Sequence, residues 1–375
     1  MFDTPVLIVG AGPAGLTTSL LLARAGTPSL LVERRDGLSV LPRATGINVR
    51  TMEIFRSIGI ADRIMAAAMD SRDLPLWVQL ETLRGPLLAS LTPQGPRGMP
   101  DSVFPTPAAH VQCAQDRLEP ILFDTLRRYP QAEMRFDTAL VSLRQDADGV
   151  VAELEERHSR RRYPVRATYA VGADGANSMV RQSMGIATTG EEHLGREVNI
   201  LFEADLAPLV QGHRASLYLV RNGTLTGIFR PVDEGSRWTL TTAHVDDPTP
   251  EQCVQAIRAG AGDPSIEPRI IVTQEWELAA AVAERFRAGR VFLVGDAAHR
   301  MTPGGALGMN TAVQDAHNLA WKLAAVLGSR GAASLLDTYQ VERRPVAERN
   351  VALSWAIWKD VRKAGHTLGA VLGVR

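Results

Sequence analysis

Residues 5–15 read PVLIVGAGPAG. The apolar run at 5–9 predicts a short buried strand, and the run LTTSLLLARAG that follows predicts an amphipathic helix ending at Gly26. A second apolar run, SLLVE at 29–33, predicts another strand, so the segment forms one strand–helix–strand unit. Such a unit indicates a parallel sheet and places the chain in the α/β class.

The glycines of this turn, Gly10, Gly12 and Gly15, have the spacing G-x-G-x-x-G. The first permits a tight turn, the second lets a pyrophosphate approach the backbone, and the third allows close helix packing. Glu33, at the end of the next strand, is suited to accept hydrogen bonds from the ribose of an adenosine. The pattern predicts an adenine dinucleotide but leaves NAD and FAD both open, with a purely structural turn as the alternative.

A second glycine-rich turn, VGDAAHRMTPGGALGMN at 294–310, lies between an apolar run and a helical pattern. Asp296, after the predicted strand, is placed to bind ribityl hydroxyls, and a helix starting near Gly308 would direct free N–H groups at a flavin. FAD is longer than NAD and needs contacts beyond the first turn. Two turns serving one extended ligand therefore favour FAD, and a third segment, ADGANSMVR at 173–181, resembles them.

Turn signals and alternating runs in the middle of the chain predict an antiparallel sheet inserted into the cofactor domain. The expected architecture is a Rossmann-like FAD-binding domain, a mostly antiparallel β substrate domain and a helical C-terminal segment. The expected boundaries are 1–70, 101–184 and 278–330 for the FAD-binding domain, 71–100 and 185–277 for the β domain, and 331–375 for the C-terminal segment.

Bulk composition excludes several other functions. The chain has 41 Lys and Arg residues and 41 Asp and Glu residues. It therefore has no overall positive charge that would indicate binding to nucleic acid. The two cysteines, Cys113 and Cys253, provide neither a disulfide framework nor metal-ligand spacing, which fits a cytoplasmic protein without a metal. No apolar run is long enough to predict a membrane span. No serine-hydrolase, zinc-protease or P-loop motif competes with the glycine-rich turns.

In their order and spacing, the three motifs resemble the group A flavoprotein monooxygenases with the para-hydroxybenzoate hydroxylase fold (FAD-binding domain of the GR2 type). LPRATGINVRTMEIFRSIGI at 41–60 resembles the branch that hydroxylates aromatic polyketides in antibiotic biosynthesis. The resemblance implies non-covalent FAD, NADPH or NADH as co-substrate, and O₂. It also implies hydroxylation of a phenolic, polycyclic substrate through a C4a-hydroperoxyflavin, with no certain catalytic side chain.

The resemblance assigns cofactor-binding roles residue by residue. The first turn, Glu33 and Arg34 would hold the ADP half, Arg43 and Gln115 the middle of the cofactor, and the backbone of Leu140 the adenine. Asp174 would link the flavin to NAD(P)H, Asp296 would bind the ribityl chain, and Pro303 would lie beside the ring. The set is completed by Pro13 and Ala14 in the first turn and by the backbone N–H groups of Gly308, Met309 and Asn310. The family pattern is broken at Ala306 and Leu307, where this branch commonly has Gly and Gln.

Several alternatives stay open on the sequence alone. The same motifs are equally compatible with an enzyme that performs Baeyer–Villiger insertion or epoxidation, or with a non-catalytic FAD-binding redox sensor. Tyr218, Arg221 and Arg230 either line the substrate pocket or face solvent, and His299 is expected to be structural. A thioredoxin-like domain commonly follows in this branch, so the chain is either a short member or a fragment, and either a monomer or a homodimer.

Overall fold

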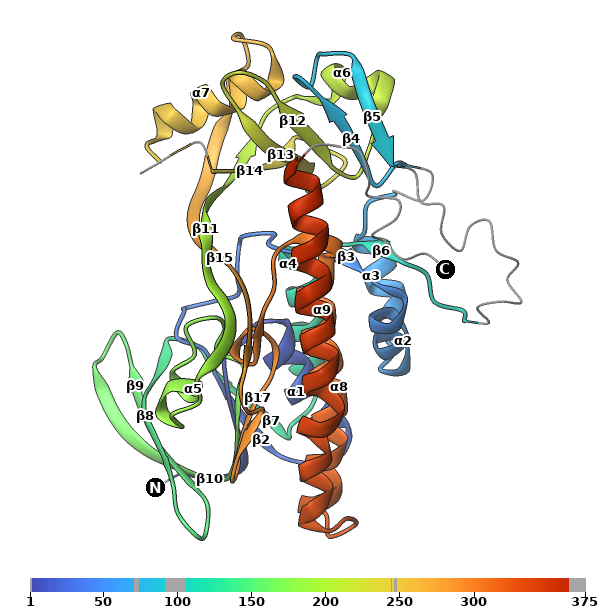
Figure 1. Ribbon diagram of the computed structural model, residues 1–375. Helices are drawn as coiled ribbons and strands as arrows, with labels where there is room; N and C mark the ends of the chain where they lie inside the picture. Colours follow the sequence, from blue (N-terminus) through green and yellow to red (C-terminus); the bar gives the residue numbers. More distant parts are fainter. Residues whose placement is uncertain (1, 71–73, 92–105, 244, 246–247, 364–375) are drawn as a thin grey trace.

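The computed structural model describes residues 2–70, 74–91, 106–243, 245 and 248–363. Two large sheets lie one above the other, and two long helices near the C-terminus run along one side of them (Figure 1). The predicted α/β class, with a parallel sheet, a mostly antiparallel second sheet and C-terminal helices, is confirmed. The domain boundaries stay a prediction.

The first sheet has the order β16-β17-β10-β1-β2-β7, with β8 and β9 as an antiparallel extension of β10. Its strands are β1 (Phe2–Val9), β2 (Ser29–Val32), β7 (Ala132–Arg135), β8 (Thr138–Gln145), β9 (Val150–Glu156), β10 (Arg161–Gly172), β16 (Arg287–Ala288) and β17 (Val291–Leu293). The pairs of β1 with β10 and β2, of β2 with β7, and of β10 with β17 are parallel. Val6, Leu7 and Ile8 are fully buried, as expected for a strand covered on both faces.

Helices cover this sheet. The central helix α1 (Pro13–Arg24) packs against α4 (Gln115–Leu126) and α8 (Leu307–Leu327). The remaining helices around this part are α2 (Val49–Ser57), α3 (Ala61–Ala67), α5 (Met179–Ser183) and α9 (Asp337–Lys363). No helix among the described residues is long and apolar enough to cross a bilayer.

The second sheet has the order β18-β15-β11-β14-β13-β12-β4-β5, and its described pairs are antiparallel except that of β12 with β4. Its strands are β4 (Trp77–Leu80), β5 (Leu87–Leu91), β11 (Thr188–Glu203), β12 (Tyr218–Arg221), β13 (Thr226–Pro231), β14 (Arg237–Thr242), β15 (Arg269–Ala283) and β18 (His299–Arg300). The long strands β11 and β15 connect the two parts of the molecule (Figure 1).

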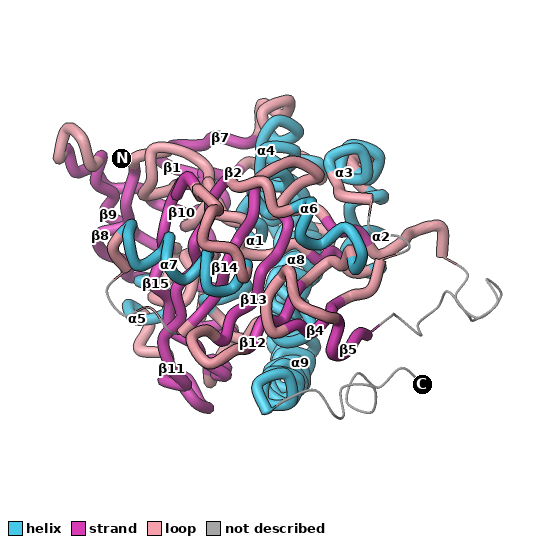
Figure 2. The backbone as a smooth tube through the Cα atoms, turned by 90° about the horizontal axis from the view of Figure 1, so that it is seen from above, coloured by secondary structure: helices cyan, strands magenta, loops and turns pink. Residues whose placement is uncertain are grey.

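Two short helices, α6 (Ala207–Val210) and α7 (Pro250–Ala261), lie on the outer side of this sheet (Figure 2). Helix α7 was not predicted from the sequence, although Thr249 and Gln252 form a capping box at its start. A small third sheet pairs β3 (Gly46–Ile47) with β6 (Val111–Gln112).

Candidate cofactor site

The first glycine-rich turn joins β1 to α1. Gly10 has φ +105°, and a Cβ there would lie 2.3 Å from the carbonyl oxygen of Ala173, at the end of β10. A Cβ at Gly15 would lie 1.9 Å from the carbonyl oxygen of Gly10. Both positions therefore require glycine, as the motif predicts. A Cβ at Gly12 would meet nothing within 4 Å, so open space lies beside the N-terminus of α1.

The second glycine-rich turn packs directly against the first. Gly295 has φ +60°, and a Cβ there would lie 3.0 Å from Cβ of Ala312 in α8 and 3.3 Å from Cβ of Ala14 in α1. Space is also open beside Gly308, in the first turn of α8. Neither α1 nor α8 has a side-chain cap at its N-terminus. Two helix N-termini with unused N–H groups thus lie in neighbouring turns, an arrangement that fits an extended anionic ligand such as FAD.

The third segment, 173–181, is fixed to the second turn. The Ser178 hydroxyl donates to one oxygen of Asp174 at 2.5 Å, and the backbone N–H of Val180 donates to the other at 3.1 Å. Burial raises the pKa of Asp174. Arg181 donates from Nη1 to the carbonyl oxygen of Ala297 at 3.1 Å. The carboxylate of Asp174 therefore stabilises the start of α5 beside the two glycine-rich turns.

Asn310 connects α8 to the stretch around β3. Its Nδ2 donates to the carbonyl oxygens of Gly46, at 2.9 Å, and Ala306, at 2.7 Å. Its Oδ1 accepts the backbone N–H of Asn48 at 2.9 Å. We expected only the backbone of Asn310 to contribute to the site, so this bridging role of its side chain was missed.

Arg43 precedes β3 and lies within electrostatic range of predicted cofactor residues. The pKa of Arg43 is lowered, first by desolvation and second by the like charge of Arg35. The carboxylates of Asp296, Glu119 and Glu33 act in the opposite direction but do not outweigh these two effects. Arg43 and Asp296 are both exposed, and so available to a ligand. This stretch therefore brings a cation close to the ribityl candidate.

Two further candidates lie in this middle region. Gln115, at the start of α4, is buried and donates from Nε2 to Glu119 at 2.7 Å, so its side chain already has a protein partner. Pro303 is exposed and precedes a short 3₁₀ turn that leads into α8, and Met309 lies in the first turn of that helix. Both belong to the loop around the N-terminus of α8.

The expected adenosine end lies at the end of β2. Glu33 is buried, and its carboxylate accepts backbone N–H groups from Ala11 at 2.8 Å and Arg35 at 3.1 Å. Its carbonyl oxygen accepts the N–H of Thr138, which starts β8. Leu140 follows in β8, where a bulge interrupts the pairing with β9. Arg34 is exposed. The structure therefore brings Glu33 and Leu140 to the same region as the first turn.

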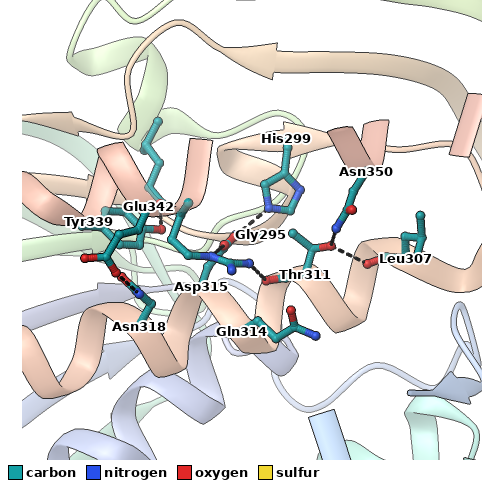
Figure 3. Close-up of polar contacts among 12 residues, drawn as sticks. Gly295, His299, Leu307, Thr311, Gln314, Asp315, Asn318, Tyr339, Glu342 and Asn350 are labelled. Carbon is teal, nitrogen blue, oxygen red and sulfur yellow. Dashed lines mark hydrogen bonds and ion pairs between the residues drawn. The ribbon is translucent and has the colours of Figure 1, made fainter. Parts of the chain in front are cut away.

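A buried ionic cluster beneath the second turn was missed by the sequence analysis. Asp315 in α8 accepts hydrogen bonds from the backbone N–H of Gly295 at 3.3 Å and from Nε of Arg343 in α9 at 2.7 Å. His299 lies with Nε2 2.6 Å from the same carboxylate (Figure 3). Burial alone would raise the pKa of Asp315, but His299 and Arg343 outweigh it and lower the pKa. The available signal was an aspartate placed among apolar residues such as Val313 and Ala316 in the helical pattern that follows the second turn.

Helix α9 also braces the first turn of α8. Thr311 donates from its hydroxyl to the carbonyl oxygen of Leu307 at 2.8 Å, and Asn350 donates to that hydroxyl at 3.0 Å (Figure 3). Tyr339 donates to the carbonyl oxygen of Leu293, next to the second turn, at 2.7 Å. The position of the α8 N-terminus therefore depends on α9.

Two neighbouring glycine-rich turns with open helix N-termini define a dinucleotide-binding α/β protein of the flavin-dependent type. Residues 3–354 match the family model described as "FAD binding domain", and the chain belongs to this FAD-binding monooxygenase family. Aklavinone 12-hydroxylase RdmE from Streptomyces purpurascens is 41% identical over 378 residues, which cover 97% of this chain and 70% of that protein. Tetracenomycin B2 monooxygenase-dioxygenase from Streptomyces olivaceus is 38% identical, and the match covers 94% of this chain and 68% of that protein.

Solved structures agree with this membership. The structure of the flavin-dependent monooxygenase PieE in complex with FAD and substrate has a TM-score of 0.90 at 38% identity, covering 96% of this chain and 64% of that chain. The ternary complex of aklavinone-11 hydroxylase with FAD and aklavinone has a TM-score of 0.87 at 40% identity, and the match covers 96% of this chain and 69% of that chain. The chain thus spans about two thirds of the length of these relatives.

Proposed function

We propose that this chain is an FAD-dependent, NAD(P)H-using monooxygenase that hydroxylates a phenolic, polycyclic aromatic substrate with one atom of O₂. The observation that carries the proposal is the close approach of the two glycine-rich turns, where a Cβ at Gly295 would lie 3.3 Å from Cβ of Ala14, with open space at Gly12 and Gly308. The aromatic substrate class is supported by relatives named for aklavinone and tetracenomycin.

In this proposal the N-terminus of α1 faces the pyrophosphate, Glu33 the ribose and Asp296 the ribityl hydroxyls. The first-turn N–H groups of α8 face the pyrimidine edge of the flavin, where the helix dipole stabilises negative charge. When bound, FAD supplies electron transfer from NAD(P)H and activation of O₂. The protein residues position the ring, and the second sheet covers it and limits access of water.

The cofactor assignment is tested with Asp296→Ala. The side chain of Asp296 is exposed and does not hydrogen-bond to another side chain among the described residues, so the variant should fold normally but lose most of its bound FAD. Asp205, an exposed carboxylate beyond β11, provides the matched control Asp205→Ala. Flavin content is measured by absorbance and folding by circular dichroism. An Asp296→Ala variant with full flavin content would remove Asp296 from the site.

The activity is tested with phenols of one to four fused rings, scored for NAD(P)H oxidation and for product mass under ¹⁸O₂. The expected product gains one ¹⁸O atom on a polycyclic phenol. Hydroxylation of small monocyclic phenols alone would overturn the substrate class, and oxygen derived from water would overturn the monooxygenase. A lactone or epoxide product would indicate the alternative outcomes of the same fold. NAD(P)H oxidation that no phenol stimulates would indicate a redox sensor.

A further inference from the structure

The polar residues of the second sheet that were considered for the substrate pocket lie in three different surroundings. Tyr218 is buried in the core of that sheet, and Arg221 is exposed. Arg230 is half-buried beside a cavity of about 10 Å³, which has room for about one water molecule. None of these surroundings therefore forms a ligand subsite among the described residues.

The two large sheets belong to separate hydrophobic cores. One core surrounds β1 and α1 in the cofactor part, and the other lies between the second sheet and α7. Strands β11 and β15 pass between these parts (Figure 1), and a register shift after Glu191 interrupts their pairing. A small apolar cluster also joins the parts, with Leu41 and Ala114 packed against Leu201 and Val232. A contact of this size does not by itself fix two parts relative to each other, so polar contacts across the boundary become important.

Two ion pairs cross this boundary, between the first turn of α4 and the turn that joins β13 to β14. Arg237 donates from Nη2 to Oδ2 of Asp116 at 2.7 Å, and Arg117 donates from Nη2 to Oδ2 of Asp233 at 3.3 Å. The side chains of Asp116 and Asp233 are only 9% and 16% exposed, and ion pairs that are shielded from water are stronger than those at the surface. Each side of the boundary thus supplies one cation and one carboxylate. We call Asp116, Arg117, Asp233 and Arg237 the seam.

The two carboxylates of the seam differ in their partners. Oδ1 of Asp233 accepts the backbone N–H groups of Gly235 at 3.0 Å and Arg237 at 3.3 Å, so this turn is ordered by its own contacts. Oδ1 of Asp116 is buried and has no hydrogen-bond partner among the described residues. Loss of Arg237 would therefore leave a buried carboxylate without its partner, which is strongly unfavourable. The first turn of α4 would have to move to bring this carboxylate to water.

The first turn of α4 also holds the loop that carries Arg43. The backbone N–H of Gln115 donates to the carbonyl oxygen of Ala44 at 2.8 Å. The carboxylate of Glu119 accepts Nε2 of Gln115 at 2.7 Å and the backbone N–H of Ser39 at 3.1 Å. These hydrogen bonds reach the loop on both sides of Arg43, which was expected to bind the middle of the cofactor. A displaced α4 would therefore displace Arg43.

Resting on the proposed cofactor site, we propose that Arg237 is a positioning residue for FAD. It acts through Asp116 on the first turn of α4, and through that turn on the loop with Arg43, without touching the cofactor itself. The second sheet thereby determines how tightly the middle of FAD is held. Because such coupling is reciprocal, bound FAD also fixes the second sheet in its position over the site.

The test follows the release of FAD from the loaded protein, as flavin that passes an ultrafiltration membrane after dilution. We expect Arg237→Gln to release FAD about ten times faster than the wild type, and Asp116→Asn to show a smaller increase. The double variant Asp116→Asn/Arg237→Gln leaves no unpaired charge and should release FAD more slowly than Arg237→Gln alone. The matched control is Arg84→Gln, because Arg84 pairs with Asp263 beside α7, away from the seam, and this variant should match the wild type.

The recovery in the double variant distinguishes positioning from general loosening of the fold. Wild-type release by Arg237→Gln and Asp116→Asn overturns the role of Arg237. A double variant at least as fast as Arg237→Gln, or an equally fast Arg84→Gln, also overturns it. Circular dichroism checks folding, and if Arg237→Gln does not fold, the comparison of Asp116→Asn with Arg84→Gln decides, with equal rates overturning the proposal.

The outcomes also separate this proposal from the proposed function. Wild-type protein that retains no FAD overturns both the cofactor site and the role of Arg237. FAD release that depends on Arg237, without an oxygenated product from any phenol, overturns the monooxygenase and leaves the role of Arg237 standing. Hydroxylation by a protein whose FAD release does not depend on Arg237 has the opposite meaning.

Discussion

Nε2 of His299 lies 2.6 Å from a carboxylate oxygen of Asp315, and both side chains are completely inaccessible to solvent. The other oxygen of Asp315 accepts from Arg343 at 2.7 Å, so one buried carboxylate connects the second glycine-rich turn, α8 and α9. Because the same carboxylate also accepts the N–H of Gly295, the cluster fixes the turn that carries Asp296. We infer that Asp315 is a positioning residue for the cofactor turn rather than a ligand of FAD.

Asp315→Asn should destabilise the protein by about 3–5 kcal/mol, because it leaves the buried Arg343 without its counter-charge. Urea unfolding of the flavin-free protein measures this change. The matched control is Asp337→Asn, since Asp337 is exposed and pairs with Arg287 at the surface, where about 1 kcal/mol or less is expected. Equal effects of the two substitutions would contradict the importance of the buried cluster.

The lowered pKa of Asp315 predicts how stability depends on pH. A carboxyl whose pKa is lower in the folded than in the unfolded state contributes stability above its unfolded pKa of about 3.9, and loses it as pH falls through the folded pKa. The groups that face Asp315 are His299, Arg343 and Tyr339. The part of the difference in unfolding free energy between wild type and Asp315→Asn that comes from the Asp315 carboxylate should therefore shrink as the pH falls below about pH 4. A difference that stays constant down to pH 2 would contradict a depressed pKa.

The sequence alone predicted the parts of the site whose geometry is local. The requirement for glycine at Gly10 and Gly15 follows from turn and packing rules, and the structure shows the same close approaches. The strand and helix around each turn were readable from hydrophobic periodicity. The antiparallel sheet in the middle of the chain was predicted from its alternating runs and turn signals, although the capping box of α7 was overlooked.

Contacts between distant segments could not be read from the sequence. Nothing in the local pattern pairs Asp315 with Arg343, because the two lie on separate helices whose relative rotation is set by packing. Likewise, the face on which Arg230 lies depends on strand register, and a shift of one residue reverses it. The side chain of Asn310 could be placed only once β3 was seen beside α8.

Ala306 lies at the N-cap of α8 in the left-handed region, with φ +53° and ψ +38°. A side chain costs about 1 kcal/mol or more in this conformation, and glycine adopts it freely. Ala306→Gly should therefore stabilise the protein or leave it unchanged, after allowance for the greater freedom of the unfolded chain. The control Ala352→Gly, at an exposed position within α9, should destabilise by about 1 kcal/mol. Thermal unfolding compares the two variants, and a loss of stability of similar size in both would contradict strain at Ala306.

The last prediction concerns the reduction of the flavin by NAD(P)H and the role of Asp174 in it. If its carboxylate couples the flavin to NAD(P)H, Asp174→Ala should slow anaerobic flavin reduction more than it weakens FAD binding, as followed by stopped-flow absorbance. The carboxylate also accepts hydrogen bonds from Ser178 and Val180 at the start of α5, so a slow variant could reflect only a lost helix start.

Ser178→Ala separates the two roles of Asp174, because it removes the hydroxyl that caps α5 and keeps the carboxylate. A direct role predicts that Ser178→Ala loses about 1 kcal/mol of stability while its flavin is still reduced at close to the wild-type rate. If Ser178→Ala slows reduction as much as Asp174→Ala does, the carboxylate acts only through the position of α5. If Asp174→Ala is reduced at the wild-type rate, Asp174 has no part in the reaction with NAD(P)H.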